Sequence, residues 1–146
     1  MTSKHATDKT SPLVGDVAEK TFVSLDEDTL VAVAAKTLYE TEASSIIVTR
    51  NEPATNTRHP IGIVTERDMI YRVVAQNKGT FKVTVGKIMS TPIITIDEDA
   101  STDEALSLMK SRKINRLPVV NRGNVLIGVV IMENLVRRAN VKTTTA

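Results

Sequence analysis

The segment Val14-Gly15-Asp16-Val17 recurs 71 positions later as Val85-Gly86-Lys87-Ile88. The acidic stretch Leu25-Asp26-Glu27-Asp28 recurs at the same offset as Ile96-Asp97-Glu98-Asp99. A period of this length is too long for a short-repeat solenoid. Two copies of one supersecondary unit predict a molecule with pseudo-two-fold symmetry, in which each small copy needs the other to complete a core.

The repeats set the predicted domain boundaries. Repeat 1 covers residues 13–75 and repeat 2 covers residues 84–140. The segment 76–83 between them begins with the polar run Gln76-Asn77-Lys78-Gly79-Thr80, which contains a glycine, as expected of a linker. The ends of the chain, 1–12 and 141–146, are polar and without hydrophobic periodicity, and we expect both to be flexible tails.

Both repeats show the same order of predicted elements, β-α-β-β-α. A short extended piece and an acidic turn lead into the first helix, which we expect to be capped by Asp28 or Thr29 in repeat 1 and by Asp99 or Ser101 in repeat 2. Two β-branched strands and a second helix follow. The order predicts an α+β fold with two small sheets packed through helices.

The first helix of each repeat has one apolar face, which we expect to lie in the core. These residues are Leu30, Val33, Ala34 and Leu38 in repeat 1, and Ala105, Leu108 and Met109 in repeat 2.

Composition excludes several classes of function. The 146 residues carry 19 Lys and Arg against 17 Asp and Glu, and the basic residues are scattered, which argues against a nucleic-acid surface. There is no cysteine, and His5 and His59 are too few for a His-rich zinc site, so we expect no metal. The apolar runs fall far short of the roughly 20 residues that a membrane span needs. We therefore expect a cytoplasmic protein.

One turn carries groups that could bind a ligand. Gly62-Ile63-Val64 is echoed 66 positions later by Gly128-Val129-Val130, so repeat 2 has five fewer residues in one connection. In repeat 1 the strand ends at Thr65, and Asp68 follows one helical turn later. Thr65 could donate a hydrogen bond to a phosphate at the helix start, and Asp68 could accept from two vicinal hydroxyls of a ribose. The same spacing is also a capping-box pattern, in which both residues only satisfy the helix terminus.

Taken together, these features resemble the CBS domain family, named after cystathionine β-synthase. The resemblance covers residues 13–140. It rests on the repeated β-α-β-β-α order, the Asp-Glu-Asp before each first helix, the strand Lys113-Ile114-Asn115-Arg116-Leu117-Pro118-Val119-Val120, and the turn from Gly62 to Asp68. The tandem arrangement resembles a Bateman module.

The resemblance implies a regulatory module that binds an adenosine-containing ligand, AMP, ADP or ATP, with S-adenosylmethionine less expected. In this family the turn threonine and the helix aspartate hold phosphate and ribose, which assigns those roles to Thr65 and Asp68. They would face residues of repeat 2, namely Thr84, Met89, Ile114, Asn115 and Arg116. Arg116 would serve as the phosphate cation, or else be a solvated charge at the strand edge.

The pseudo-symmetric second site departs from this pattern. Ile131 and Asn134 stand at the positions of Thr65 and Asp68, so the hydroxyl is lost and the carboxylate has become an amide. Ser44 and Ser45 stand where the other copy has Asn115 and Arg116, so the cation is lost as well. We expect this second site to be weak or empty.

The leading hypothesis is a non-catalytic sensor that acts on a separate partner protein or through its own dimer, since no nucleophile-base pair is recognisable. The apolar segments Met69-Ile70-Val73-Val74 and Leu135-Val136 would suit a homodimer contact or the intramolecular core. The alternative is a scaffold for dimerisation or interaction that keeps the fold without a ligand. Neither hypothesis involves nucleic acid or a membrane.

Overall fold

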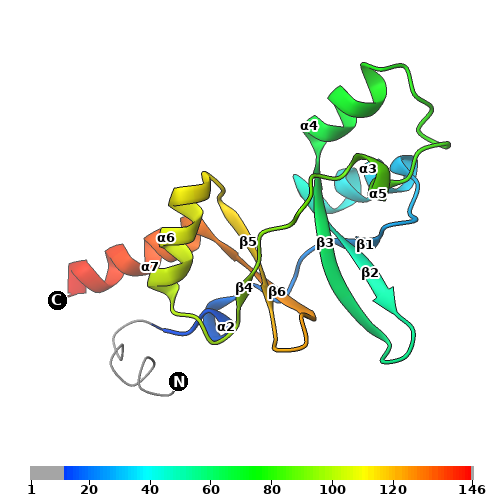
Figure 1. Ribbon diagram of the computed structural model, residues 1–146. Helices are drawn as coiled ribbons and strands as arrows, with labels where there is room; N and C mark the ends of the chain where they lie inside the picture. Colours follow the sequence, from blue (N-terminus) through cyan, green and yellow to red (C-terminus); the bar gives the residue numbers. More distant parts are fainter. Residues whose placement is uncertain (1–11, 146) are drawn as a thin grey trace. The chain divides into compact units, whose positions relative to one another are not determined.

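The computed structural model describes residues 12–145, which divide into two compact units (Figure 1). We call Phe22–Ile93 the central unit. Residues 12–21 and 94–145 together form the terminal unit. Of the predicted tail 1–12, all but Pro12 lies outside the described residues.

Both units contain a three-stranded sheet in which the first strand is parallel to the second and the second is antiparallel to the third. The central unit has the sheet order β1-β2-β3 and consists of β1 (Ser24–Asp26), α3 (Val31–Thr41), β2 (Ser45–Glu52), β3 (Thr57–Thr65), α4 (Glu66–Met69), the π-helical turn η1 (Ile70–Val74) and α5 (Val85–Ile88). The terminal unit has the order β4-β5-β6 and consists of α2 (Val14–Val17), β4 (Ile96–Asp97), α6 (Thr102–Arg112), β5 (Arg116–Val120), β6 (Leu126–Ile131) and α7 (Met132–Thr145). The predicted α+β class with two small sheets is confirmed.

The five-residue difference between the repeats lies in the antiparallel hairpin. Strands β2 and β3 have 8 and 9 residues, whereas β5 and β6 have 5 and 6. The glycine keeps its place in both hairpins, because Gly62 pairs with Val48 and Gly128 pairs with Val119. The shorter repeat has therefore lost strand length and kept the register beside its second helix.

The recurring Val-Gly segments attach to the opposite repeat. The N–H of Gly15 in α2 donates to the carbonyl of Glu98 at 2.9 Å, and the N–H of Gly86 in α5 donates to the carbonyl of Glu27, also at 2.9 Å. A Cβ on Gly86 would lie 2.9 Å from the Glu27 carbonyl oxygen, so the close backbone contact requires glycine. Each unit thus combines one repeat with the short helix that precedes the other (Figure 1).

The predicted caps of the first helices are only partly correct. Helix α6 is capped by Ser101, whose hydroxyl accepts the Glu104 N–H at 3.1 Å while the Glu104 carboxylate accepts the Ser101 N–H at 3.4 Å. The prediction of Asp28 or Thr29 for α3 was wrong, because the N-cap is Leu30 and has no side-chain cap bond.

The start of α3 is satisfied by backbone groups instead. The N–H of Val31 donates to the carbonyl of Val83 at 2.9 Å, and that of Ala32 to the carbonyl of Thr80 at 3.0 Å. The acidic residues close the preceding turns: an Asp26 carboxylate oxygen accepts the Asp28 N–H at 3.0 Å. Linker carbonyls thus replace a capping side chain in the central unit.

Each unit has its own hydrophobic core. In the central unit the buried residues include Val31, Ala34 and Leu38 of α3 together with Ile46, Val48, Val64, Met69, Val73, Val85 and Ile88. The terminal core contains Val14, Ile96, Ala105, Met109, Leu117, Val119, Val130 and Leu135, with Leu108 packed at its border. The prediction that Val33 belongs to the core was wrong: its side chain is 49% exposed, because Val31 sets the inward face of a helix that begins one residue after Leu30.

The last helix is longer than predicted. Helix α7 continues to Thr145 and includes residues 141–145, which the sequence placed in a tail. Once a helix is nucleated, each further residue adds one backbone hydrogen bond, which favours this extension. Among the helices of residues 12–145, none combines the length and apolarity needed to cross a membrane.

Candidate functional site

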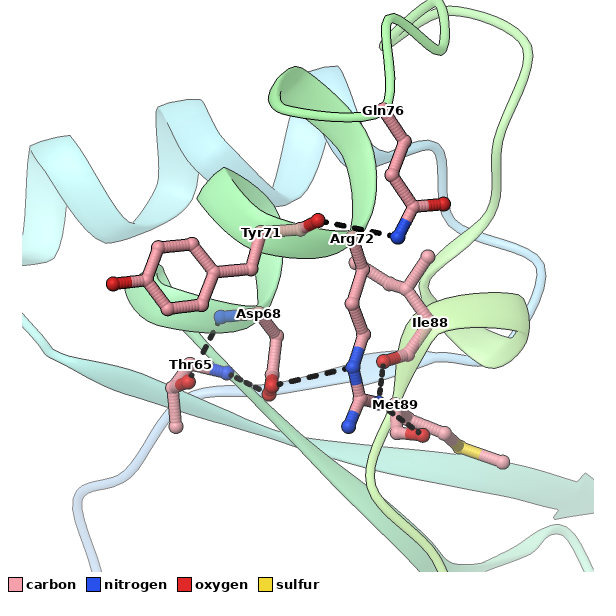
Figure 2. Close-up of polar contacts among 7 residues, drawn as sticks. All are labelled: Thr65, Asp68, Tyr71, Arg72, Gln76, Ile88 and Met89. Atoms are coloured by element: carbon pink, nitrogen blue, oxygen red, sulfur yellow. Dashed lines mark hydrogen bonds and ion pairs between the residues drawn. The ribbon is translucent and has the colours of Figure 1, made fainter.

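The candidate site begins where β3 ends and α4 starts. Thr65 has extended backbone angles and caps the helix, with its hydroxyl oxygen accepting the Asp68 N–H at 3.2 Å. In return, Oδ2 of Asp68 accepts the Thr65 N–H at 2.9 Å. The capping interpretation of the Thr-x-x-Asp spacing is therefore confirmed. The capping box uses Oδ2 of the Asp68 carboxylate, and Oδ1 faces another side chain (Figure 2).

That group is Arg72, a residue which the sequence analysis missed. Its Nε lies 3.8 Å from Oδ1 of Asp68. Its Nη1 donates to the carbonyl of Ile88 at 2.7 Å and to that of Met89 at 3.3 Å. The Asp68 side chain is 14% exposed, so the carboxylate is turned away from bulk water. The spacing of four residues between Asp68 and Arg72 was the only signal in the sequence.

Arg72 belongs to a π-helical turn that follows α4 directly. The N–H of Ala75 donates to the carbonyl of Ile70 at 2.8 Å, five residues back, and the Gln76 side chain donates to the carbonyl of Tyr71 at 3.2 Å. Figure 2 shows the Tyr71 ring pointing away from Arg72. Single π-turns inside helices are frequent at functional sites.

Met89 is held against β3 by backbone and side-chain contacts. The backbone groups of Ile63 and Ser90 exchange two hydrogen bonds, of 3.2 Å and 2.8 Å. Gly62 lies beside them, and a Cβ there would approach the Met89 sulfur to 2.5 Å and the Ser90 carbonyl oxygen to 3.0 Å. The strand glycine therefore permits the close approach of Met89, as expected of a glycine at this point of a strand.

The central unit brings several of the predicted site residues together. Thr65, Asp68 and Met89 are connected through Arg72. Thr84 is the N-cap of α5 and bridges to Leu30. Residues 44 and 45, predicted for the second site, also adjoin Thr65: Ser45 pairs with it in the sheet, and the Ser44 carbonyl accepts the Glu66 N–H at 3.4 Å.

The remaining predicted residues lie in the terminal unit. They are Ile114, Asn115, Arg116, Ile131 and Asn134. Arg116 is exposed and pairs with Ile131 in the sheet, and the Asn115 carbonyl accepts the Met132 N–H at 2.8 Å. Asn134, at the position of Asp68, directs its side-chain amide to the Glu19 carboxylate at 3.5 Å. Glu19 is a second residue that the sequence analysis missed, since 115 positions separate it from Asn134.

The chemistry of the central-unit cluster is that of a hydrogen-bonding site. It offers a shielded carboxylate, a hydroxyl and a guanidinium within two turns of one helix. In residues 12–145 no group of three His, Cys, Asp or Glu side chains is arranged to hold a metal ion. A carboxylate that is already oriented by its own backbone is well suited to accept hydrogen bonds from ligand hydroxyls.

Comparison with known proteins places this geometry in a family. The chain is 37% identical over 125 residues to an uncharacterized protein of Methanopyrus kandleri, covering 85% of this chain and 61% of that protein. It is 29% identical over 123 residues to the inosine-5'-monophosphate dehydrogenase of Methanocaldococcus jannaschii, covering 84% of this chain and only 23% of the enzyme. The chain thus spans about three fifths of the first relative's length and a much smaller share of the enzyme.

A solved structure has a similar fold. The CBS domain pair of protein MJ0100, in complex with 5'-methylthioadenosine and S-adenosyl-L-methionine, is 26% identical with a TM-score of 0.71, covering 90% of this chain and 98% of that one. The model of the CBS domain matches residues 14–75 and again residues 85–140. With both repeats matched and the two sheets in place, this chain belongs to the CBS domain family and carries two copies of the domain.

Proposed function

We propose that this protein is a non-catalytic regulatory module that senses an adenosine-containing ligand of the AMP, ADP and ATP class. Asp68 accepts the ribose hydroxyls and Thr65 donates to a phosphate. The ligand state is passed to a partner protein or to the protein's own dimer. The observation that carries the proposal is the carboxylate of Asp68, which is 14% exposed and turned toward Arg72.

The geometry of Asp68 supports a role as hydroxyl acceptor. Its Oδ2 accepts the Thr65 N–H, while Oδ1 is 3.8 Å from Arg72, beyond hydrogen-bond distance. Vicinal hydroxyls of a ribose can therefore donate to Oδ1 and to the second lone pair of Oδ2. Hydrogen bonds to an ionised carboxylate are roughly twice as strong as neutral ones.

The family supports the choice of ligand class. 5'-Methylthioadenosine and S-adenosyl-L-methionine, bound by the CBS pair of protein MJ0100, share the adenosine group with the nucleotides. We assign further ligand contacts to Thr84, Met89, Ile114, Asn115 and Arg116, and a weaker second site to Ser44, Ser45, Ile131 and Asn134. The proposal also places the protein in the cytoplasm, without a metal cofactor and without nucleic acid or membrane as partner.

Calorimetric titration with AMP, ADP, ATP, S-adenosylmethionine and 5'-methylthioadenosine tests the proposal. We expect Asp68→Ala to lower the affinity at least about tenfold, the effect of losing a hydrogen bond to a charged group. Glu104→Ala is the matched control, because Glu104 forms the same reciprocal capping box with Ser101 in the terminal unit. The control should lose stability and keep its affinity. Unchanged affinity in Asp68→Ala would contradict the assignment of the ribose.

A second candidate function is a ligand-free scaffold for dimerisation or interaction. The observation that favours it is the complete capping box, which gives both Thr65 and Asp68 a structural duty. Thermal melts separate the two functions, since a ligand at 100 times its dissociation constant stabilises the folded state by about 2.7 kcal/mol. No shift with any of the five ligands would favour the scaffold.

A further inference from the structure

We propose that Arg72 is a positioning residue which ties the Asp68 carboxylate to the end of α5, so that occupation of Asp68 by a ligand changes the segment that leaves the central unit. The inference rests on the proposed function for the identity of the ligand. Its structural part, the coupling of Asp68 to α5 through Arg72, stands on contacts within the central unit.

The guanidinium contacts two segments that are far apart in the sequence. Its Nε faces Oδ1 of Asp68 at 3.8 Å, and its Nη1 donates to the carbonyls of Ile88 and Met89 at 2.7 Å and 3.3 Å. The planar guanidinium has several donors in a fixed arrangement, so one side chain can serve a carboxylate and two carbonyls together. Figure 2 shows Arg72 reaching from its helix to both partners.

The contacted carbonyls lie at the point where the chain leaves α5. Helix α5 ends at Ile88, Ser90 is bonded to Ile63 of β3, and the central unit ends at Ile93. The following residue, Ile94, belongs to the terminal unit. Arg72 orients Oδ1 of Asp68, so a ligand hydroxyl that donates to Oδ1 favours the arrangement in which Arg72 faces the carboxylate and binds the Ile88 and Met89 carbonyls. The ligand can shift the α5 end only by the difference in its affinity for the two arrangements.

The terminal unit lacks this arrangement. The residue at the position of Arg72, 66 positions later, is Arg138, and that at the position of Asp68 is Asn134. The neutral amide of Asn134 contacts Glu19, and α7 is one continuous α-helix from Met132 to Thr145 without a π-turn. Arg138 therefore offers a matched control with the same side chain at the equivalent position.

Hydrogen exchange of the full chain without ligand tests the coupling itself. The reporters are the Met89 N–H, bonded to the Val85 carbonyl at 2.9 Å, and the Ser90 N–H, bonded to the Ile63 carbonyl at 2.8 Å. We expect Arg72→Gln to accelerate their exchange at least about tenfold. Asp68→Asn should accelerate the same amides, and the double variant should exchange no faster than Arg72→Gln. Arg138→Gln should leave both amides unchanged.

Titration with AMP tests the positioning role. Arg72→Gln should weaken AMP binding, and the double variant should bind no more weakly than Asp68→Asn alone. Unchanged exchange at Met89 and Ser90 in Arg72→Gln, or additive effects of the two substitutions, would overturn the coupling. Faster exchange of the Met89 and Ser90 amides with unchanged AMP affinity would overturn the positioning role and leave Arg72 with a structural role only.

The two proposals can fail separately. If wild-type protein does not bind AMP, the ligand assignment fails, while the exchange measurements still decide the coupling. If Arg72→Gln does not fold, Arg72→Lys replaces it. The lysine keeps the charge but cannot face the carboxylate and both carbonyls at once, so the Met89 and Ser90 amides should again exchange faster than in the wild type.

Discussion

The sulfur of Met89 lies so close to Gly62 that a Cβ on this residue would approach it to 2.5 Å. Gly62→Ala should therefore displace Met89, and the Ser90 carbonyl oxygen, 3.0 Å from the same Cβ, leaves little room for relief. We expect destabilisation of about 1 kcal/mol, because overpacking outweighs the entropy gained from replacing glycine.

Urea denaturation measures this effect. Gly79→Ala is the control, since its nearest contact would be the flexible Lys82 side chain at 3.4 Å, and it should be neutral or slightly stabilising. Adding Met89→Ala to Gly62→Ala should relieve part of the overpacking strain. Equal stability of Gly62→Ala and wild type would show that Met89 moves aside at no cost.

The exposure of two neighbouring valines in α3 gives a second prediction. Val31 is 1% exposed and Val33 is 49% exposed. Val31→Ala should lower the free energy of unfolding by about 2 kcal/mol, the cost of removing buried methyl groups and leaving a cavity. Val33→Ala should change it by less than about 0.5 kcal/mol. Chemical denaturation measures the free energy of unfolding of both variants. Similar losses of stability in the two would contradict the assignment of Val31 to the inward face of α3.

The capping box of α6 predicts the effect of a single hydroxyl. Ser101→Ala removes the acceptor of the Glu104 N–H and should cost about 1 kcal/mol of stability. Ser107→Ala is the control, because Ser107 is exposed in the interior of the same helix, where alanine is the better helix former. Thermal unfolding should show a lower midpoint for Ser101→Ala alone. A drop of the same size in both variants would mean that the cap is not responsible.

The ion pair between Arg50 and Glu27 predicts that the free energy of unfolding depends on pH. Arg50 donates from Nε to Oε2 at 2.7 Å and from Nη2 to Oε1 at 3.0 Å, and this hydrogen bonding lowers the pKa of Glu27 from its ordinary 4.5. Because the folded-state pKa is the lower one, the pair stabilises the fold above the ordinary value. That contribution is lost as the pH falls through the folded-state pKa. The effect should be small, since the Arg50 side chain is 62% exposed.

Urea midpoints of wild type and Glu27→Gln at pH 7 and pH 3 measure this contribution. The difference between the two proteins should be present at pH 7, shrink at pH 3 and weaken in concentrated salt. Glu98→Gln is the control, because Asn121 stands at the position of Arg50 in the second repeat. A pH-independent difference for Glu27→Gln would contradict the ion pair as its source.

The exposed apolar side chains of η1 predict how the proposed homodimer forms. Met69, Val73 and Leu135 of the predicted dimer faces are buried within their own units, whereas Ile70 and Val74 are 53% and 63% exposed. The double variant Ile70→Asp/Val74→Asp should remain folded and lose the dimer, because it places charges on an apolar contact.

Sedimentation of the double variant beside wild type tests the dimer face. Lys87→Asp, an exposed change on α5, should leave the dimer intact. A dimer that persists in the double variant would place the contact on another surface.

Part of the site could be predicted because its signals are local. The Thr65 and Asp68 spacing encodes a capping box within four residues, and the strand glycine before it marks a close approach. Arg72 could not be assigned in the same way. Its spacing from Asp68 is visible in the sequence, but its carbonyl partners are 16 and 17 residues away and use backbone groups that every residue has.

The sequence by itself determined the duplication, the order of elements, a connection shorter by five residues in repeat 2, and the capping-box spacing of Thr65 and Asp68. These features depend on side-chain periodicity and on caps, which act over a few residues. Only the tertiary structure decided which sheet each short helix belongs to. Helix α2 lies in the unit that contains β4, β5 and β6, and α5 lies in the unit that contains β1, β2 and β3. Those attachments are backbone hydrogen bonds between distant segments, and their donors and acceptors have no side-chain signature, so the choice of partner depends on how the whole chain folds.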